Sequence, residues 1–199
     1  MNTIPTLEGN GVRLEPLAQH HFEALCGIAR DPLIWRYMNL KLERPEDVAA
    51  HIETSVANAE KGLIMPWIVF VGDEAAGSSS FFEIQPAHRT AELGFTWFAA
   101  PWRSSGLNPR VKLLQLTHAF ETLLLRRIAL KTHHDNLHSQ NAMLKLGAQY
   151  EGTFRNHMIM PDGTTRHSKW YSITAEDWPD VKAKLTERIA TEALQRRTL

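Results

Sequence analysis

A short polar segment, Arg103-Ser104-Ser105-Gly106-Leu107-Asn108, has the residue types and spacing that point most directly to chemistry. A run of β-forming residues at 91–99 precedes it, and an amphipathic run at 108–125 follows it. The first turn of a helix leaves backbone N–H groups without partners, and the helix dipole adds partial positive charge there. A small-residue loop lets a phosphate approach those donors, and an arginine can add a charge-assisted contact. The order strand, loop, helix therefore predicts a phosphate or pyrophosphate seat.

The elements that must position this loop follow from hydrophobic spacing, turn residues and helix caps. Strands are expected at 12–15, 64–71, 76–84, 91–99, 128–132, 150–160 and 165–174, and helices at 17–30, 44–61, 108–125, 136–146 and 176–197. The middle of the series alternates strand and helix, with an antiparallel hairpin on either side. We therefore expect an α/β (α+β) fold over 1–199, a single domain with its core at about 11–175 and a terminal helix at 176–197. Its mixed sheet should have about seven strands, with helices on both faces.

Composition excludes several classes of protein. Lysine plus arginine and aspartate plus glutamate both number 22, so the formal net charge is zero. A general nucleic-acid or anionic-membrane binder would show a basic excess, so neither partner is expected. Cys26 is the single cysteine, which rules out an intrachain disulfide, and its apolar neighbours predict burial. Without a signal-peptide pattern or a long apolar run, the expected location is the cytoplasm.

The polar loop differs from two common phosphate loops. It lacks the Gly-Lys-Ser/Thr ending of a Walker A loop and two of the three glycines of a dinucleotide-binding fingerprint. It resembles Arg/Gln-x-x-Gly-x-Gly/Ala, the pyrophosphate loop of GNAT acyl-CoA transferases, with Asn108 in place of the last Gly or Ala. A second motif at 136–148 resembles the Asn-x-x-Ser-x-x-x-Leu-x-x-x-Gly-Phe/Ala element of the same family. The resemblance covers about 12–178 and is strongest to the RimJ/RimL-type ribosomal-protein-alanine acetyltransferases.

The resemblance implies a single-domain GNAT fold and a role for each residue of the first motif. The pyrophosphate of acyl-CoA would be held by Arg103, Ser104, Ser105, Gly106, Leu107 and Asn108. Backbone groups would pair with the pantetheine arm at Trp97, Phe98 and Ala99. The fourth and fifth strands of the expected sheet, 91–99 and 128–132, would splay apart and admit acyl-CoA between them.

The resemblance also assigns the second motif to the cofactor. Asn136 would reach the pantetheine or the acceptor, and Ser139 would lie near the sulfur of CoA. Ala142, Met143 and Lys145 would flank the cofactor along one helix face. Many family members carry a tyrosine on this helix, where Met143 and Leu144 stand here.

Acetyl transfer to an amine requires little of the protein. The amine loses a proton, attacks the thioester carbonyl and expels the thiolate, so a base, an oxyanion donor and an acid suffice. Glu92 and Glu83 are the candidate bases, although each could be an ordinary solvated or ion-paired strand residue, and a water chain could replace both. Strand alternation puts Glu92 on one face with Gly94, Thr96 and Phe98.

The resemblance makes a backbone N–H near Phe98 the oxyanion donor. Ser139 is the candidate acid, or else a first-turn residue that satisfies backbone donors.

Several other polar residues have an ordinary structural interpretation. Three histidines, His133, His134 and His138, lack an evident further ligand, so no metal site is expected. Lys112 could reach a phosphate of CoA, but the solvated side of its helix is favoured. Residues 35–38 could line an acceptor pocket or belong to the core. Three cationic side chains could meet an acidic acceptor or a partner: Arg155, His157 and Arg166.

The sequence therefore predicts an acetyl-CoA-dependent N-acetyltransferase that acts on a primary amine, either a protein N-terminus or a small molecule. A homodimer is expected from the family and the long terminal helix. The alternatives are a CoA-binding module without catalysis and an unrelated nucleotide-phosphate binder that uses the same helix terminus.

Overall fold

The computed structural model describes residues 3–197, and one continuous sheet of eight strands runs through them. The strand order is β1-β2-β3-β4-β5-β6-β8-β7, and only β5 and β6 pair in parallel. The bounds are β1 Leu7–Gly9, β2 Val12–Pro16, β3 Ile64–Val71, β4 Glu74–Gln85, β5 Thr90–Phe98, β6 Arg127–His133, β7 Gln149–Ile159 and β8 Thr165–Thr174. The expected mixed sheet is confirmed, with one strand more than predicted.

The additional strand is β1, which pairs with β2 through a two-residue turn. Asn10 and Gly11 occupy this turn with φ of 52° and 71°. A type I′ hairpin turn needs positive φ at both central positions, and Asn-Gly is one of its preferred sequences. The local sequence therefore contained the hairpin signal that the strand prediction missed.

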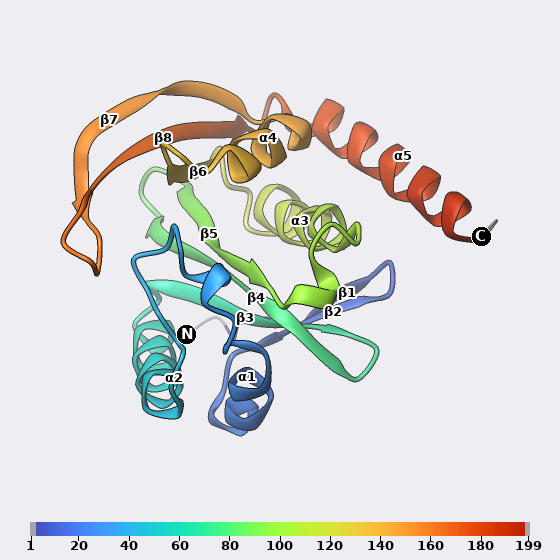
Figure 1. Cartoon of the computed structure of the whole chain (residues 1–199). Coiled ribbons are helices and arrows are strands. Elements are labelled where there is room, and N and C mark those ends of the chain that lie inside the picture. Colours follow the sequence, from blue (N-terminus) through green and yellow to red (C-terminus); the bar gives the residue numbers. More distant parts are fainter. Residues whose placement is uncertain (1–2, 198–199) are drawn as a thin grey trace.

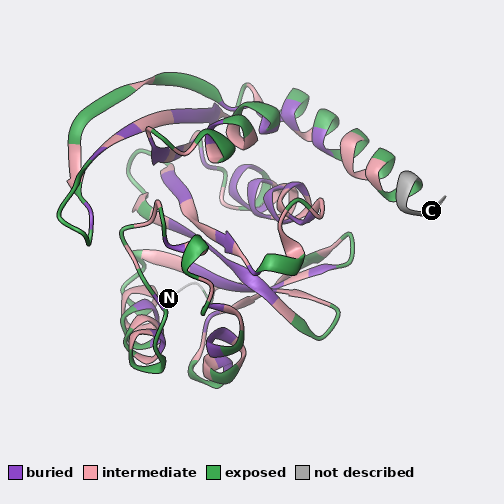
Figure 2. Cartoon of the chain, viewed as in Figure 1, coloured by how far each residue is buried: buried purple, intermediate pink, exposed green. Residues whose placement is uncertain are grey.

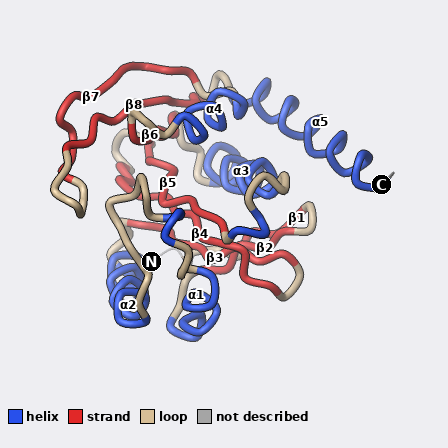
Figure 3. Tube along the Cα trace, in the orientation of Figure 1, coloured by secondary structure: helices blue, strands red, loops and turns tan. Residues whose placement is uncertain are grey.

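Helices cover both faces of the sheet, as Figures 1 and 3 show. They are α1 Phe22–Ile28, α2 Pro45–Glu60, α3 Leu107–Thr117, α4 Leu137–Leu146 and α5 Trp178–Arg197. The long helix expected at 108–125 is shorter, because a π-helical turn, His118–Thr122, follows α3 and Leu124 has a φ of 52°. The one expected at 17–30 is reduced to α1 and a 3₁₀ turn, Gln19–His21. Within residues 3–197, no helix has the length and apolar character needed to cross a membrane.

The sheet separates two hydrophobic cores. One lies against α3 and α5 and contains Leu93, Val111 and Ile128, whereas the other lies against α1 and α2 and contains Ile52 and Trp97. Figure 2 shows the buried central strands beside the mostly exposed β7, which curves with β8 away from the rest of the sheet. The two faces of the sheet therefore pack against different helices through separate sets of buried residues.

β5 and β6 pair at three consecutive positions, the last of which joins Glu92 to Ala129. Beyond it, β5 stays with β4 while β6 stays with β8. The predicted separation of these two strands is confirmed; they are β5 and β6 in the observed numbering because β1 was not expected. The edge of β5 after Glu92 is therefore left without a neighbouring strand on that side.

β4 and β5 approach each other so closely that Gly77 has no room for a side chain. A Cβ there would lie 2.1 Å from the Trp97 carbonyl oxygen and 2.8 Å from the Phe98 ring. We therefore expect Gly77→Ala to lower the free energy of unfolding by about 1–3 kcal/mol, measured by urea denaturation. Gly27→Ala in α1 is the matched control, because nothing lies within 4 Å of its Cβ position. The control should be neutral or stabilising by up to about 1 kcal/mol, and equal losses in both variants would contradict the steric argument.

Candidate functional site

The predicted phosphate seat is built as a loop that leads directly into the first turn of α3. Ser104 has a φ of 56°, and Gly106, the N-cap residue of α3, has a φ of 73°. Leu107 and Asn108 begin the helix, so their N–H groups belong to the set without intrahelical partners. Left-handed conformations in such a loop turn successive N–H groups toward one side, which suits an anion.

Arg103 makes contacts within the protein that the sequence did not predict. Its Nε donates a hydrogen bond to the Phe98 carbonyl oxygen at 3.1 Å, and its Nη2 lies 2.7 Å from an Asp31 carboxylate oxygen. The guanidinium therefore fastens the loop to the end of β5 and to the segment after α1. The backbone of the loop is left as the principal set of donors at the α3 terminus.

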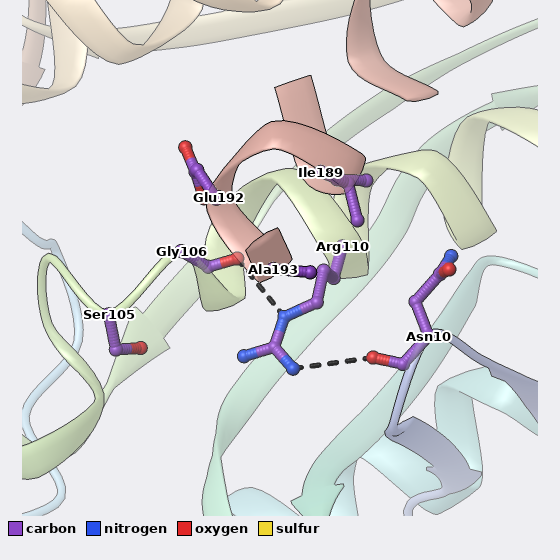
Figure 4. Close-up of a pocket in the computed structure, with 7 residues that line it drawn as sticks. All are labelled: Asn10, Ser105, Gly106, Arg110, Ile189, Glu192 and Ala193. Atoms are coloured by element: carbon purple, nitrogen blue, oxygen red, sulfur yellow. Dashed lines mark hydrogen bonds between the residues drawn. The ribbon is translucent and has the colours of Figure 1, made fainter. Parts of the chain in front are cut away.

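A pocket of about 240 Å³ borders the phosphate seat (Figure 4). It is lined by Asn10, Ser105, Gly106, Arg110, Ile189, Glu192 and Ala193. Arg110 bridges two of its walls, because Nε donates to the Gly106 carbonyl oxygen at 3.2 Å and Nη1 to that of Asn10 at 3.3 Å. Sequence analysis missed both Arg110 and the contribution of α5, since neither lies in the recognised motif.

The second motif spans the whole of α4, from its N-cap residue to the residues directly after its end. Asn136 is the N-cap residue, and its side-chain oxygen accepts a hydrogen bond from the Ser139 N–H at 3.1 Å. The capping role considered for Ser139 thus belongs to Asn136, and the Ser139 hydroxyl makes no hydrogen bond within the described chain. Met143 packs against the core on the α3 side, whereas Lys145 is exposed. The Ser139 hydroxyl is therefore available to a ligand.

Glu92 lies at the point where β5 and β6 separate. It is 3% exposed, and its Oε2 lies 2.8 Å from Lys131 Nζ. Burial raises the pKa of the Glu92 carboxyl, while the charge and hydrogen bond of Lys131 oppose that rise. A raised pKa brings a carboxylate closer to the range in which it can accept a proton from a substrate near neutral pH.

Glu83, the other candidate base, is exposed. It has a φ of 49° and lies in an irregular stretch of β4 between Phe82 and Gln85. Of the two carboxylates, Glu92 is the one that the structure holds in a buried ion pair at the strand separation.

The expected sharing of a face by Glu92, Thr96 and Phe98 is wrong because β5 contains a bulge. Phe95 has a φ of 48°, and the register with β4 shifts between Gly94 and Trp97. A bulge adds a residue to one strand and reverses the alternation beyond it. Thr96 accordingly lies with Ser79 and Lys112, on the α3 side of the sheet. Phe98 packs against the core on that side, opposite Glu92.

Lys112 is buried, which contradicts the expectation that it is solvated. It is 5% exposed, and Nζ lies 2.7 Å from Thr96 Oγ1, 3.1 Å from Ser79 Oγ and 3.2 Å from Gln115 Oε1. All three partners are uncharged, and burial lowers the pKa of this lysine to about 7. The ammonium group therefore lies directly behind the bulge of β5.

The histidines of this region do not form one common cluster. His133, His134 and Asp135 have side-chain ligand atoms within 4.8 Å of one another, and a second such group combines Glu15 with His20 and His21. His133 Nδ1 already accepts the Asp135 N–H at 3.1 Å. His138 is exposed on α4.

The predicted burial of Cys26 is confirmed.

The buried lysine should make stability depend on pH. Lys112 loses its proton near pH 7 in the folded protein, but near its ordinary value of 10.5 in the unfolded chain. Between these values the unfolded state binds more protons, so rising pH stabilises the folded wild type relative to Lys112→Met. The free energy of unfolding of the wild type, relative to that of Lys112→Met, should therefore be lowest below about pH 7 and rise by a few kcal/mol toward about pH 10. Urea denaturation across this range measures the difference, and Lys145→Met is the exposed-lysine control; a pH-independent difference for Lys112→Met would refute the argument.

Comparisons with known proteins agree with this geometry. A family model described as "Acetyltransferase (GNAT) domain" matches residues 12–149. The N-acetyltransferase YoaA of Bacillus subtilis, itself uncharacterised, is 28% identical over 85% of this chain and 97% of its own length. The ribosomal-protein-serine acetyltransferase of Escherichia coli is 24% identical over 76% of this chain and 86% of its own.

A solved structure of a presumed acetyltransferase from T. thermophilus is 36% identical, with a TM-score of 0.84, over 94% of this chain and 99% of the other. The predicted relationship to ribosomal-protein acetyltransferases is confirmed at low identity, and solved structures of RimL and of Mycobacterium smegmatis RimJ, 18% and 22% identical, share the fold with a TM-score of 0.79 each. Because the family model matches most of this chain, the chain belongs to the GNAT family and is an N-acetyltransferase.

Proposed function

We propose that this protein transfers an acetyl group from acetyl-CoA to a primary amine by direct attack of the amine in a ternary complex. GNAT membership implies acetyl-CoA as co-substrate. The observation that carries the proposal is the position of Glu92, a buried carboxylate where β5 and β6 separate, at the start of the unpaired stretch of β5 that leads to the α3 phosphate seat.

The residues present fit the parts of acetyl-CoA. The backbone donors of Gly106, Leu107 and Asn108 suit a pyrophosphate, because they combine unpaired N–H groups with the helix dipole. The open edge of β5 up to Phe98 and Ala99 suits an amide-bearing arm such as pantetheine, which can pair with a strand edge as a further strand would. Pairing along this edge would direct the thioester toward the bulge and Glu92.

The chemical step requires a proton acceptor for the amine. Glu92 takes this role in our proposal, since burial raises its pKa and so favours proton uptake, while the hydrogen bond from Lys131 stabilises the ionised carboxylate before the amine proton is transferred to it. A backbone N–H of β5 in the bulged stretch between Phe95 and Phe98 supports the developing oxyanion. Ser139, whose hydroxyl is unengaged, is the donor for the departing thiolate.

The acceptor belongs to the class of primary amines. The similarity to an enzyme named for ribosomal-protein serine supports protein N-termini as acceptors, and small amines remain the other source. In this proposal, the residues that distinguish a protein N-terminus from a small amine lie outside the two cofactor motifs, on the face of the sheet that carries Glu92.

Replacing Gly106 tests the phosphate seat. Gly106→Val places a branched side chain at a φ of 73° next to the helix N–H groups, so we expect the Kd for CoA to rise by about tenfold or more. Gly62→Val is the matched control, because Gly62 has a φ of 71° at the end of α2 with nothing within 4 Å of its Cβ position. Calorimetry with CoA should show weakened binding for Gly106→Val alone. Unchanged affinity in that variant would remove the loop from the cofactor site.

Replacing Glu92 tests the base. We expect Glu92→Gln to lower kcat for acetyl transfer by about 100-fold or more while the Kd for CoA stays close to that of the wild type. Glu83→Gln, which alters the exposed carboxylate, should retain most of the activity. Thiol release with a panel of primary amines measures the rate, and thermal unfolding with CoA verifies that the variant is folded. Full activity of Glu92→Gln would exclude this carboxylate as the base, and wild-type protein that binds CoA but acetylates no amine would favour a silent CoA-binding module.

A further inference from the structure

β8 carries a buried arginine, Arg166, on the face of the sheet that is turned away from α3. We propose that Arg166 binds a carboxylate of the acceptor, so that the amine substrate of this enzyme carries its own carboxylate group. This inference rests on the proposed function, because it concerns the second substrate of the same reaction. It adds a specificity-determining residue on the acceptor side.

The orientation of Arg166 follows from the alternation along its strand. Tyr171 and Ile173 of β8 belong to the core on the α3 side, as do Ile128 and Leu130 of β6. Alternate residues point to opposite faces of a sheet. The side chains at 166, 168 and 170 of β8 and at 129, 131 and 133 of β6 therefore share the face on which Glu92 lies.

The polar contacts of Arg166 are all with uncharged groups. It is 6% exposed; its Nε donates to Ser168 Oγ at 3.0 Å and its Nη1 to the Tyr37 carbonyl oxygen at 3.3 Å. Within residues 3–197, no carboxylate oxygen lies within 4.0 Å of the Arg166 guanidinium, and Nη2 donates no hydrogen bond. Burial lowers the pKa of Arg166, with the distant charge of Glu92 acting in the opposite sense. A buried guanidinium without an anion is costly, so the environment of Arg166 favours the arrival of one.

The charged groups near Arg166 do not neutralise it. Lys131 is paired with Glu92, and Asp135 lies beside His133 and His134. His133 and His157 also lie here, and burial is the main cause that lowers the pKa of both; the positive charge of Arg166 adds to the lowering, whereas Asp135 opposes it at His133. A ligand that brings a negative charge would supply the partner that Arg166 lacks within residues 3–197.

A second unsatisfied donor belongs to the same region. Trp170 lies opposite Lys131 in the register of β6 and β8, and the lysine Nζ is 5.0 Å from its ring centroid. Its indole Nε1 is buried and has no hydrogen-bond partner among residues 3–197. A buried donor without a partner is uncommon, and it fits a ligand oxygen better than a further cation.

A carboxylate suits these donors, because Nη2 of the guanidinium can give it a charge-assisted hydrogen bond. Glu92 and Arg166 lie on the same face of the sheet and influence each other electrostatically without forming an ion pair. In our proposal the acceptor presents its amine to Glu92 and its carboxylate to Arg166. Either an amino acid or a peptide with an acidic residue near its N-terminus has both groups.

The test uses the whole protein, acetyl-CoA and two matched pairs of amines: alanine with alaninamide, and Ala-Asp-Ala-amide with Ala-Asn-Ala-amide. We expect kcat/KM of the wild type to favour the carboxylate member of one pair by about 10- to 100-fold, as a charge-assisted hydrogen bond would. The pair that shows the preference identifies the source, amino acid or peptide. Arg166→Gln should abolish the preference through KM, leaving kcat on the neutral member within about threefold, and Arg166→Lys should restore part of it. Arg155→Gln, which alters an exposed arginine of β7, is the control and should keep the preference.

The outcomes separate this inference from the proposed function. Equal use of both members in both pairs, or a preference that survives in Arg166→Gln, would overturn the role of Arg166 while acetyl transfer stands. Where turnover is too slow to measure, calorimetry of the same four amines with the CoA-bound protein gives the same comparison, and absence of a carboxylate preference there also overturns it. Protein that neither binds CoA nor transfers acetyl to any amine would instead refute the proposed function.

Discussion

The parting of β5 and β6 after three paired residues is the constraint on which the rest of this molecule depends. Backbone N–H and C=O groups inside a protein need partners, and a strand edge that loses its neighbour must find others. In this chain the unpaired stretch of β5 follows directly on Glu92, and the loop after that strand leads into α3. The unpaired backbone groups of β5 therefore lie between the buried Glu92 carboxylate at one end and the N-terminus of α3 at the other.

Buried charges are arranged on the two faces of β5 according to its bulge. Glu92 and Lys131 form an ion pair on one face, whereas Lys112 is held by hydroxyl and amide oxygens on the other. Without the extra residue at Phe95, strand alternation would bring Thr96 to the face of Glu92, away from Lys112. One irregular backbone position thus determines which polar groups can reach the gap.

Much of this arrangement could be predicted from the sequence, because hydrophobic periodicity and turn residues are local signals. The strand at 64–71 and the helix at 44–61 agree with the structure to within one residue at each end. The failures depend instead on how distant elements meet, as in the burial of Lys112 beneath β4 and β5 and the bulge at Phe95. A period of two cannot reveal an inserted residue, and a helical pattern counts a lysine as polar wherever it points. β1 is a different case, because the Asn10-Gly11 turn signal was present in the sequence.

The division of the core into two clusters by the sheet has a consequence for how this enzyme can change over evolutionary time. Packing on the α3 side, where the loop before that helix lies, shares few residues with packing on the α1 and α2 side. Substitutions at sites without shared partners act almost independently on stability. A lineage could therefore remodel the segment around Tyr37, and so acquire new acceptors, while the packing around α3 is inherited unaltered.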